Sequence, residues 1–465
     1  MHSTFMKIAG AFAPIQSIAE PAVRAASWFV PDEVRAGSRV ALSREIVATL
    51  FIMLAMATIE GGVIAVFAKH AFADSVSRGT LNLLVGLLAA MGELANILSF
   101  FWSSASHAKP KVKMMTGMYA GVVACIGLIA LLPTTGMPGL VALLLLVLAA
   151  RVCWSGVITL RPTVWRANYP RETRMRAVGI ISGIQVLCVA IVGMVMSRVL
   201  DWNAEAYRVF LPVAAALGLI GVLIFSRTRV RHEAKLLREE RDEGGEKVMK
   251  PWRGPVAVWE VLRRDKWYAQ FMLWMFVLGF GNLTVMPTMV IALKEDHGLG
   301  YFKSVLITSS IPCIATLIGI PVWRRFLDRA HVVRFRAVHS WTFVLASVFY
   351  TIGAATHQLG WYFVAAGLMG FGFGGGSLAW NLGHVDFARP SETSKYMATH
   401  VTLNGLRGLL APLSVTAAYE ALKDRGVDAH LWVQVFALVI SVIGAAGFVH
   451  LRVSMGKALE KKVER

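Results

Sequence analysis

The stretch Gly156-Val-Ile-Thr-Leu-Arg-Pro-Thr-Val-Trp-Arg-Ala-Asn-Tyr-Pro-Arg-Glu-Thr173 has a counterpart 220 positions later, Gly376-Ser-Leu-Ala-Trp-Asn-Leu-Gly-His-Val-Asp-Phe-Ala-Arg-Pro-Ser-Glu-Thr393. The opening glycine and the closing Pro-x-Glu-Thr, at 170–173 and 390–393, occur in both copies. Each copy joins one long apolar run to the next through a short polar turn. The chain therefore contains an internal duplication, around which the rest of its sequence is arranged.

The composition is that of a protein embedded in a membrane. Of the 465 residues, 56% are hydrophobic and 16% are charged, whereas about 25% are charged in soluble domains. The net charge of +19 would suit nucleic acid, but the basic residues lie between apolar runs, as membrane topology requires. We therefore expect a lipid bilayer, and no nucleic acid, among the partners. The four cysteines lie inside apolar runs, so we expect no disulfide.

Twelve apolar runs follow one another along the chain, and each is long enough to cross about 30 Å of hydrocarbon as a helix. We therefore predict an all-α polytopic membrane protein with twelve transmembrane helices. The runs are 45–68, 79–103, 113–133, 138–160, 176–198, 207–226, 267–293, 303–323, 336–355, 360–385, 396–419 and 431–451.

The basic residues are distributed unequally between the two sets of loops. Thirty-seven of the 47 Lys and Arg residues fall in the two tails, the central segment and the loops on the same side, and eight fall in the opposite loops. Because loops rich in Lys and Arg stay inside, we expect both termini in the cytoplasm and the chain in the cell inner membrane.

The duplication and the runs together predict the domain organisation. A cytoplasmic N-terminal segment covers residues 1–44, and two six-helix bundles cover 45–226 and 267–452. Between them, residues 227–266 are expected to form a cytoplasmic linker with a charged helix, a break at Gly244-Gly245 and a helix lying in the membrane interface. Residues 453–465 form a cytoplasmic tail.

Two segments at corresponding places in the two halves end in a similar run of basic residues. The segment from Gly319 to Arg336 contains Asp328-Arg329 and a basic end, and the segment 102–113 of the first half keeps only the basic end. With the repeated six-helix plan, these segments resemble the major facilitator superfamily (MFS) from about residue 45 to 452. The resemblance implies two parallel six-helix repeats, with spans one, four, seven and ten around a central cavity and spans two, five, eight and eleven beside them.

Four charged residues lie near the middle of predicted spans, where a charge costs at least about 2.5–3.5 kcal/mol and so suggests function. Glu60 and Glu93 are candidates for proton coupling, together with Arg151, whose surroundings resemble the span-four motif of the family. Arg407 is a substrate-binding candidate. The alternative for each is a structural role, such as an internal pair between a Glu and an Arg.

Further polar residues of the spans extend the candidate substrate site. His400, Asn404 and Arg407 recur at intervals of four and three, so they share a helix face that suits a carboxylate or phosphate. Asn282 is the repeat partner of Glu60, and Asn381 lies near the end of span ten. We expect these residues to bind a polar or anionic solute.

The duplication also predicts a gate. Arg166 and Asp386 occupy equivalent positions at the cytoplasmic ends of spans four and ten. We hypothesise that they form a salt bridge that closes this side, the alternative being separate solvated ends. Asp386 is two residues from His384, which suits a metal poorly, so we expect no metal site.

The sequence favours a secondary active transporter of small organic solutes, coupled to protons and working by alternating access. It contains no Walker motif, zincin pattern or nucleophile elbow, so we expect neither enzymatic activity nor a cofactor. The expected partners are a small-molecule substrate, protons and the bilayer, and the chain is expected to be a monomer. Two alternatives are a non-transporting assembly factor or receptor on the same fold, and a flippase for lipid or lipid-linked substrates.

Overall fold

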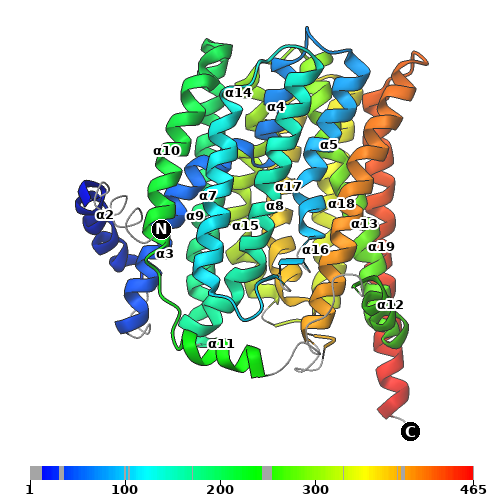
Figure 1. Cartoon of the computed structure of the whole chain (residues 1–465). Helices are drawn as coiled ribbons and strands as arrows, with labels where there is room; N and C mark the ends of the chain where they lie inside the picture. The colour runs from blue at the N-terminus through cyan, green and yellow to red at the C-terminus, as the bar shows by residue number, and fades with distance from the viewer. Residues whose placement is uncertain are drawn as a thin grey trace.

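The protein is a bundle of long helices that run roughly along one common direction (Figure 1). The computed structural model describes residues 13–30, 36–98, 101–102, 105–169, 171–242, 254–327, 329–384, 386–388 and 393–463. Every regular element in these ranges is helical, which confirms the predicted all-α fold. Pro170, Asp328 and residues 389–392, which the motifs singled out, lie outside the described residues.

The helices of the first half follow the predicted apolar runs, except α2, which precedes the first of them. They are α2 (Ala13–Ala26), α3 (Ala36–Met56), α4 (Gly61–Ala71), α5 (Arg78–Asn96), α7 (Lys111–Ile129), α8 (Gly136–Asn168), α9 (Arg171–Trp202) and α10 (Tyr207–Phe225).

The second half repeats the plan with one interruption, a π-helical turn in its second span. Its elements are α13 (Lys266–Glu295), α14 (Tyr301–Val305), the π turn η5 (Leu306–Ser310), α15 (Ile311–Leu327), α16 (Val332–Thr356), α17 (Leu359–Leu382), α18 (Thr393–Lys423) and α19 (Ala429–Val463).

Eleven helices in the described ranges are long and apolar enough to cross a membrane. The predicted run 396–419 is helical as well, since it lies within α18, but α18 is not among the eleven. Polar residues such as His400, Asn404 and Arg407 lower its hydropathy. α18 nevertheless packs against α5, α13 and α19, so protein neighbours rather than lipid cover much of it.

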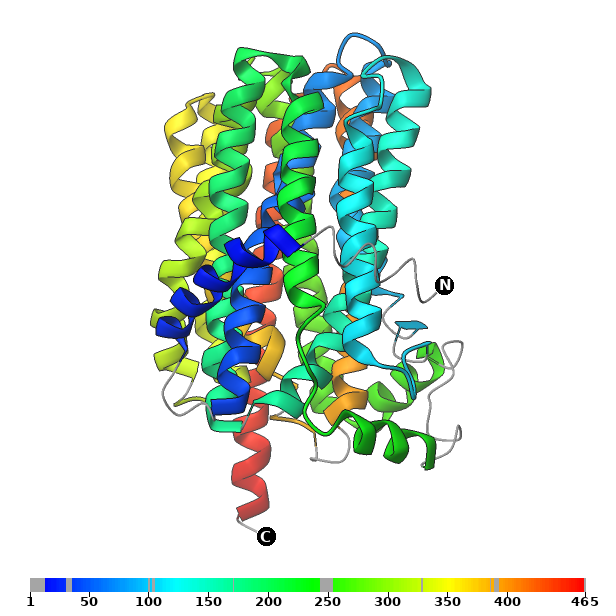
Figure 2. The same ribbon diagram turned by 60° about the vertical axis from the view of Figure 1, so that its left-hand side comes forward.

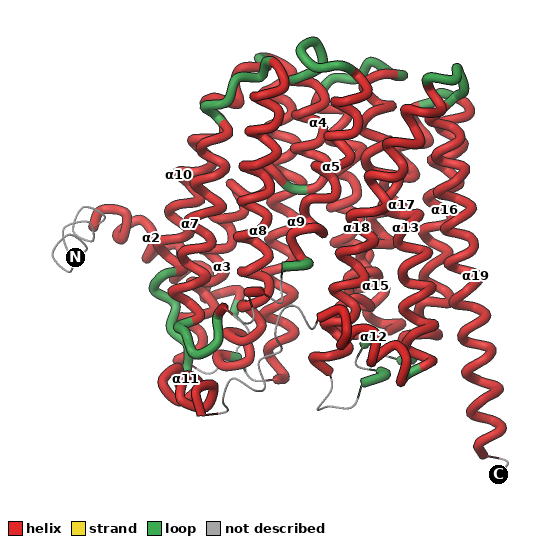
Figure 3. Tube along the Cα trace, turned by 45° about the vertical axis from the view of Figure 1, so that its right-hand side comes forward, coloured by secondary structure: helices red, strands yellow, loops and turns green. Residues whose placement is uncertain are grey.

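The first predicted span, 45–68, is divided at its middle. α3 passes through a 3-10 turn, η2 (Ala57–Ile59), and stops at Glu60, whose backbone is extended at φ −92° and ψ 152°. α4 begins at the next residue. Gly61 and Gly62 ease this break because glycine has wide backbone freedom. Figure 3 shows the break as a short loop segment inside the bundle.

The internal duplication is visible in side-chain contacts. The indole Nε1 of Trp102 donates to the carbonyl of Val152 at 3.0 Å, and Nε1 of Trp323 donates to the carbonyl of Phe371 at 3.0 Å. In each half a tryptophan at the end of the second span thus bonds the backbone of the fourth span. The sequence repeat is therefore also a structural repeat, since corresponding helices of the two halves make corresponding bonds.

The central linker contains two helices, α11 (Glu233–Asp242) and α12 (Gly254–Arg264), and both lie at the end of the bundle beyond which α19 projects (Figure 2). We call this the linker end, and the opposite end, where α4 stops and α14 begins, the far end. α11 is held to the first half because Glu240 accepts hydrogen bonds from the backbone N–H of Ala108 at 2.7 Å and from Lys111 at 2.8 Å.

Candidate functional site

Glu60 and Arg151 form an ion pair at the break in the first span. The Arg151 guanidinium donates to the Glu60 carboxylate, and its second nitrogen donates to the carbonyl of Ile59 at 2.6 Å. That carbonyl precedes the residue at which the helix stops. One side chain of α8 therefore neutralises a carboxylate and supplies a hydrogen bond to backbone at the break, as a polar group at membrane depth requires. The pair is partly open, since 33% of the Glu60 side chain is exposed.

The break lies against the π turn η5 of the second half. A Cβ atom built on Gly62 would lie 2.4 Å from Oγ1 of Thr308, so only glycine permits this approach. Nearby, the hydroxyl of Ser310 donates to the carbonyl of Ala190 in α9 at 3.1 Å. Two irregular backbone segments, one from each half, therefore meet beside the Glu60–Arg151 pair. Such π segments occur often at functional sites.

Glu93 joins the two halves through a short chain of hydrogen bonds. Nδ2 of Asn404, in α18, donates to the Glu93 carboxylate of α5 at 2.5 Å, and Asn96 donates to the same oxygen at 3.3 Å. Oδ1 of Asn404 accepts a hydrogen bond from Arg407, whose other nitrogen donates to the carbonyl of Met275 at 2.5 Å. Asn404 therefore stands between the carboxylate and the guanidinium.

Glycines make room for this chain. A Cβ atom on Gly408 would lie 2.2 Å from the Cβ of Glu93, and one on Gly279 would lie 2.0 Å from a nitrogen of Arg407. The backbones of α18 and α13 therefore approach the charged side chains as closely as atoms permit. The charges of Arg151 and Arg407 both act on Glu93, so the Glu60 and Glu93 sets form one electrostatic site.

A group of buried basic side chains lies on the second-half side of this site. Arg336 and His400 are 4% and 2% exposed, and His400 lies near Arg407, Arg336 and His384. The Nε of Arg336, Nδ1 of His384 and both ring nitrogens of His400 have no hydrogen-bond partner in the described part of the chain. Burial lowers the pKa of His384, so that ring is neutral at pH 7.

Sequence reasoning identified His400, Asn404 and Arg407 but missed Arg336 in this group. Arg336 had been counted with the basic loop between spans eight and nine, because it lies at the edge of an apolar run. In the structure it is inside α16, where His339 faces its guanidinium at 3.3 Å. Arg336 lies three residues before His339, so the two side chains share a helix face. That spacing is the signal that the sequence contains.

A network of charges at the far end ties the halves together. Lys69, which is 3% exposed, donates to Glu295 of the second half at 2.5 Å and to Asn82. Asn82 also donates to Glu420 at 2.5 Å, and Lys423 donates to Glu295 at 2.5 Å. We call these five residues the far-end network. Lys69, Asn82, Glu295, Glu420 and Lys423 were not among the predicted site residues, because they lie at span ends, where charges are common.

Other contacts reinforce the closure of the far end. The Asp201 carboxylate of α9 accepts from the backbone N–H groups of Tyr301 and Phe302 at 2.6 and 3.0 Å, so the first half caps α14 of the second. His70 stacks on the ring of Tyr301 at 4.3 Å. The larger hydrophobic core also crosses between the halves at this end, where it includes Val290 and Val415.

The remaining predicted site residues have separate positions. The Asp386 carboxylate accepts from the backbone N–H of Val332 at 2.7 Å and so caps α16, while Arg166 is exposed at the end of α8. In this conformation Asp386 thus bonds a helix of its own half. The salt bridge between Arg166 and Asp386 stays a prediction. Oδ1 of Asn282 is buried without a partner in the described ranges. The side chain of Asn381 lies outside the described residues.

Two matched helical halves, with opposed charges between them at mid-depth, define a polytopic membrane protein with the architecture of a solute transporter. The chain belongs to the Major Facilitator Superfamily, whose family model matches residues 24–412. Comparison with curated protein sequences finds no match.

Several solved transporter structures share the fold. The nucleoside transporter NupG is 15% identical, with a TM-score of 0.63 over 88% of this chain and 98% of that one. A D-xylose–proton symporter is 11% identical, with a TM-score of 0.64 over 88% and 96%. A POT family transporter in complex with 5-aminolevulinic acid is 12% identical, with a TM-score of 0.65 over 91% and 99%. At these identities the likeness establishes the fold alone.

Proposed function

We propose that this chain is a secondary active transporter that moves a small polar or anionic organic solute across the cell inner membrane by alternating access, coupled to protons. In this proposal the linker end faces the cytoplasm, as the distribution of Lys and Arg supports. The observation that carries the proposal is the hydrogen bond between Glu93 and Asn404, which puts a carboxylate at the junction of two halves that must move apart.

The composition of the site favours an anionic solute. Arg407 and Arg336 lie near His400, and several nitrogens of this group have no partner in the described part of the chain. Buried donors are ordinarily satisfied, so such nitrogens suit the oxygens of a carboxylate or phosphate. Glu93 is bonded through Asn404 and Asn96, which leaves Arg407 able to turn from Asn404 toward a ligand.

The partners of Glu93 support proton coupling. Asn404 is neutral, so protonation of Glu93 breaks no direct ion pair, and the hydrogen bond to Asn404 is free to break as the halves separate. A solute anion on Arg407 would favour that protonation by removing part of the positive field at Glu93. The likeness in fold to a D-xylose–proton symporter supports this coupling as a proposal.

The test is solute-driven proton movement in proteoliposomes. The purified full chain is reconstituted with an internal pH dye, and carboxylates, phosphate esters, nucleosides, sugars and short peptides are added outside. We expect one anionic class to move protons with wild-type protein and not with Glu93→Gln. Glu205→Gln is the matched control, because Glu205 is exposed at the far end and pairs with Arg208 of its own half.

Two results would count against the proposal. Equal proton movement by wild type and Glu93→Gln would remove Glu93 from the coupling. If no solute moves and none raises the unfolding temperature of the purified protein, a non-transporting receptor or assembly factor on this fold is the better description. Movement of a labelled lipid alone would instead favour the flippase.

A further inference from the structure

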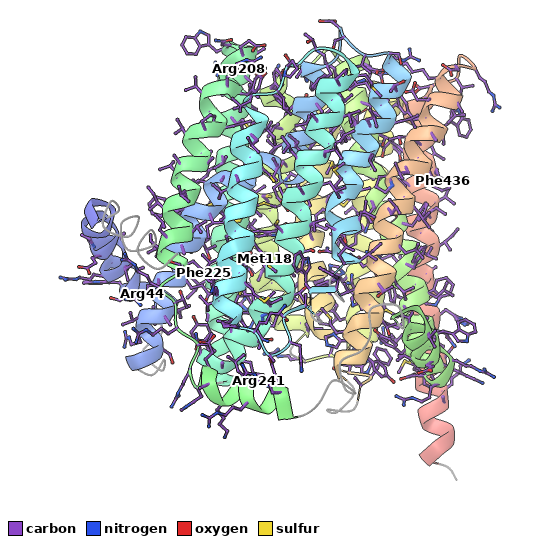
Figure 4. The ribbon with its side chains drawn as sticks, viewed as in Figure 1. Arg44, Met118, Arg208, Phe225, Arg241 and Phe436 are labelled. Atoms are coloured by element: carbon purple, nitrogen blue, oxygen red, sulfur yellow. The ribbon has the colours of Figure 1, made fainter. Side chains whose placement is uncertain are left out.

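An open cavity lies outside the helical bundle, between the N-terminal helix α2 and the ends of α3 and α10. α2 lies against the outer side of the bundle, toward the linker end (Figure 1), and Figure 4 shows Arg44 on α3 close to it. The cavity has a volume of about 390 Å³, within the range of ligand sites. It is remote from Glu60 and Glu93, so transport chemistry does not account for it.

The cavity is strongly basic. Arginines from all three sides line it, namely Arg24 of α2, Arg39 and Arg44 of α3 and Arg227 after α10, against a single acidic residue, Glu20. Glu20 pairs with Arg24 at 4.0 Å with both side chains largely exposed, so it offsets little of this charge. Arg44 uses one of its five donors on the carbonyl of Arg227, at 3.0 Å.

Buried hydroxyls in the same place have no partner. Ser43 lines the cavity and is 2% exposed, and its Oγ has no hydrogen-bond partner in the described ranges. A second cavity, of about 560 Å³, shares Arg44 and Arg227 with the first and is lined by Thr228. The hydroxyl of Thr228 is likewise buried without a partner there. A buried hydroxyl beside several arginines suits an oxygen-rich anion.

The cavity also has an apolar wall at the level of the membrane surface. Val23, Val40 and Ile224 line it together with the arginines, and 49% of Val40 is exposed. Arg39 and Arg44 lie in the first two turns of the apolar span that starts at Ser38, and Arg227 lies just past the span that ends at Phe225. The cavity therefore lies at the linker-end edge of these two spans, where arginines and apolar side chains stand side by side.

We propose that this cavity binds an anionic phospholipid, with the phosphate held by Arg24, Arg39 and Arg227 beside Ser43, and an acyl chain along Val40 and Ile224. A water-soluble anion would use the arginines but not the apolar wall, and a zwitterionic lipid would bring its own cation into a basic site. Basic residues near a membrane surface attract anionic lipids. The bound lipid would fasten α2 to α3 and α10, whatever solute the bundle carries.

Thermal unfolding of the purified full chain in detergent tests this site. The probes are phosphatidylglycerol, phosphatidylcholine with the same acyl chains, and inorganic phosphate, and native mass spectrometry counts the lipids retained. We expect phosphatidylglycerol to raise the unfolding temperature more than phosphatidylcholine. In Arg24→Gln/Arg227→Gln this difference should fall by at least half. Arg238→Gln/Arg241→Gln, which removes the same charge from exposed positions on α11, should leave it unchanged.

If the double variant folds poorly, Ser43→Ala provides a second test of the site. Its hydroxyl has no protein partner in the described part of the chain, so the lipid-free protein should unfold at the wild-type temperature while the preference for phosphatidylglycerol weakens. A full preference in both the double variant and Ser43→Ala would overturn the proposal. Equal stabilisation by inorganic phosphate would also overturn it, since the site would then take a free anion and not a lipid.

Discussion

At the scale of single residues, the site is built from pairs of side chains in which each supplies the hydrogen bond or the opposite charge that the other requires. Arg151 is 11% exposed, and it bonds both the Glu60 carboxylate and the Ile59 carbonyl. Without Arg151, a carboxylate and a carbonyl at mid-depth would lose their partner together. Without Glu60, Arg151 would remain as a cation inside the bundle. Each single replacement therefore costs more than the pair contributes.

A double-mutant cycle should reveal this dependence. We expect Arg151→Met to destabilise the protein by about 1–3 kcal/mol, a value below that of a fully buried pair because Glu60 is partly exposed. Glu60→Gln/Arg151→Met should cost less than the sum of the two single variants, measured as free energies of unfolding in detergent. Strictly additive costs would show that the two side chains act independently.

Two substitutions of Glu93 should distinguish its effect on stability from its effect on proton coupling. Glu93→Gln retains an oxygen that accepts from Asn404, so we expect its stability to stay within about 0.5 kcal/mol of wild type. It should still exchange labelled solute between the two sides but lose proton-driven accumulation. Glu93→Ala, which removes the acceptor, should lose stability as well. Proton-driven accumulation by Glu93→Gln at the wild-type level would contradict this role.

At the scale of elements, hydropathy predicted the helices well and their irregularities poorly. Each of the twelve runs contains a helix in the described residues, and eleven of these helices are long and apolar enough to cross a membrane, because an apolar run in a bilayer has few alternatives. The break at Glu60 was not predicted, because its stability depends on Arg151, which lies 91 residues away in the sequence.

The candidate site was predicted in part for the same reason. Charges within spans stood out against apolar neighbours, so Glu60, Glu93, Arg151 and Arg407 were found. Which charge pairs with which was left open, because it depends on how α5, α8 and α18 pack. The far-end network gave no signal of that kind, since Lys69 and Glu295 lie at helix ends, where a charge is ordinary.

The packing of α18 on α5 should depend on one glycine. Gly408→Ala would put a methyl group 2.2 Å from the Cβ of Glu93, so the helices must separate, and we expect a loss of about 1–3 kcal/mol. Gly367→Ala is the matched control, because that helical glycine has nothing within 4 Å of the added atom and should be neutral or stabilising by up to about 1 kcal/mol. The unfolding temperatures of the two variants are compared. Equal changes in both would contradict the close contact between Gly408 and Glu93.

At the scale of the whole molecule, the bonds between the halves are concentrated at the far end and at mid-depth. There the far-end network, the Asp201 cap on α14 and a shared hydrophobic core join the halves. Toward the linker end, α8 packs on α5, α7 and α9, and α17 packs on α15 and α16, so each stays within its own half. The structure therefore represents a state closed at the far end, and the proposed alternating access requires the far-end network to break.

The last prediction concerns the balance between this state and one open at the far end. Lys69→Met removes a buried cation from Glu295 and Asn82, a loss of about 1–3 kcal/mol that shifts a two-state equilibrium about 5–150-fold. Spin labels on cysteines at Asp74 and Arg425, exposed far-end positions of the two halves, report it in a background without native cysteines. We expect Lys69→Met to add a population at longer distance and Lys303→Met, an exposed far-end control, to leave the distribution unchanged. If Lys69→Met also leaves it unchanged, the apolar core and the Asp201 cap close this end without the network, and the switch between states must be controlled at Glu93 and Asn404.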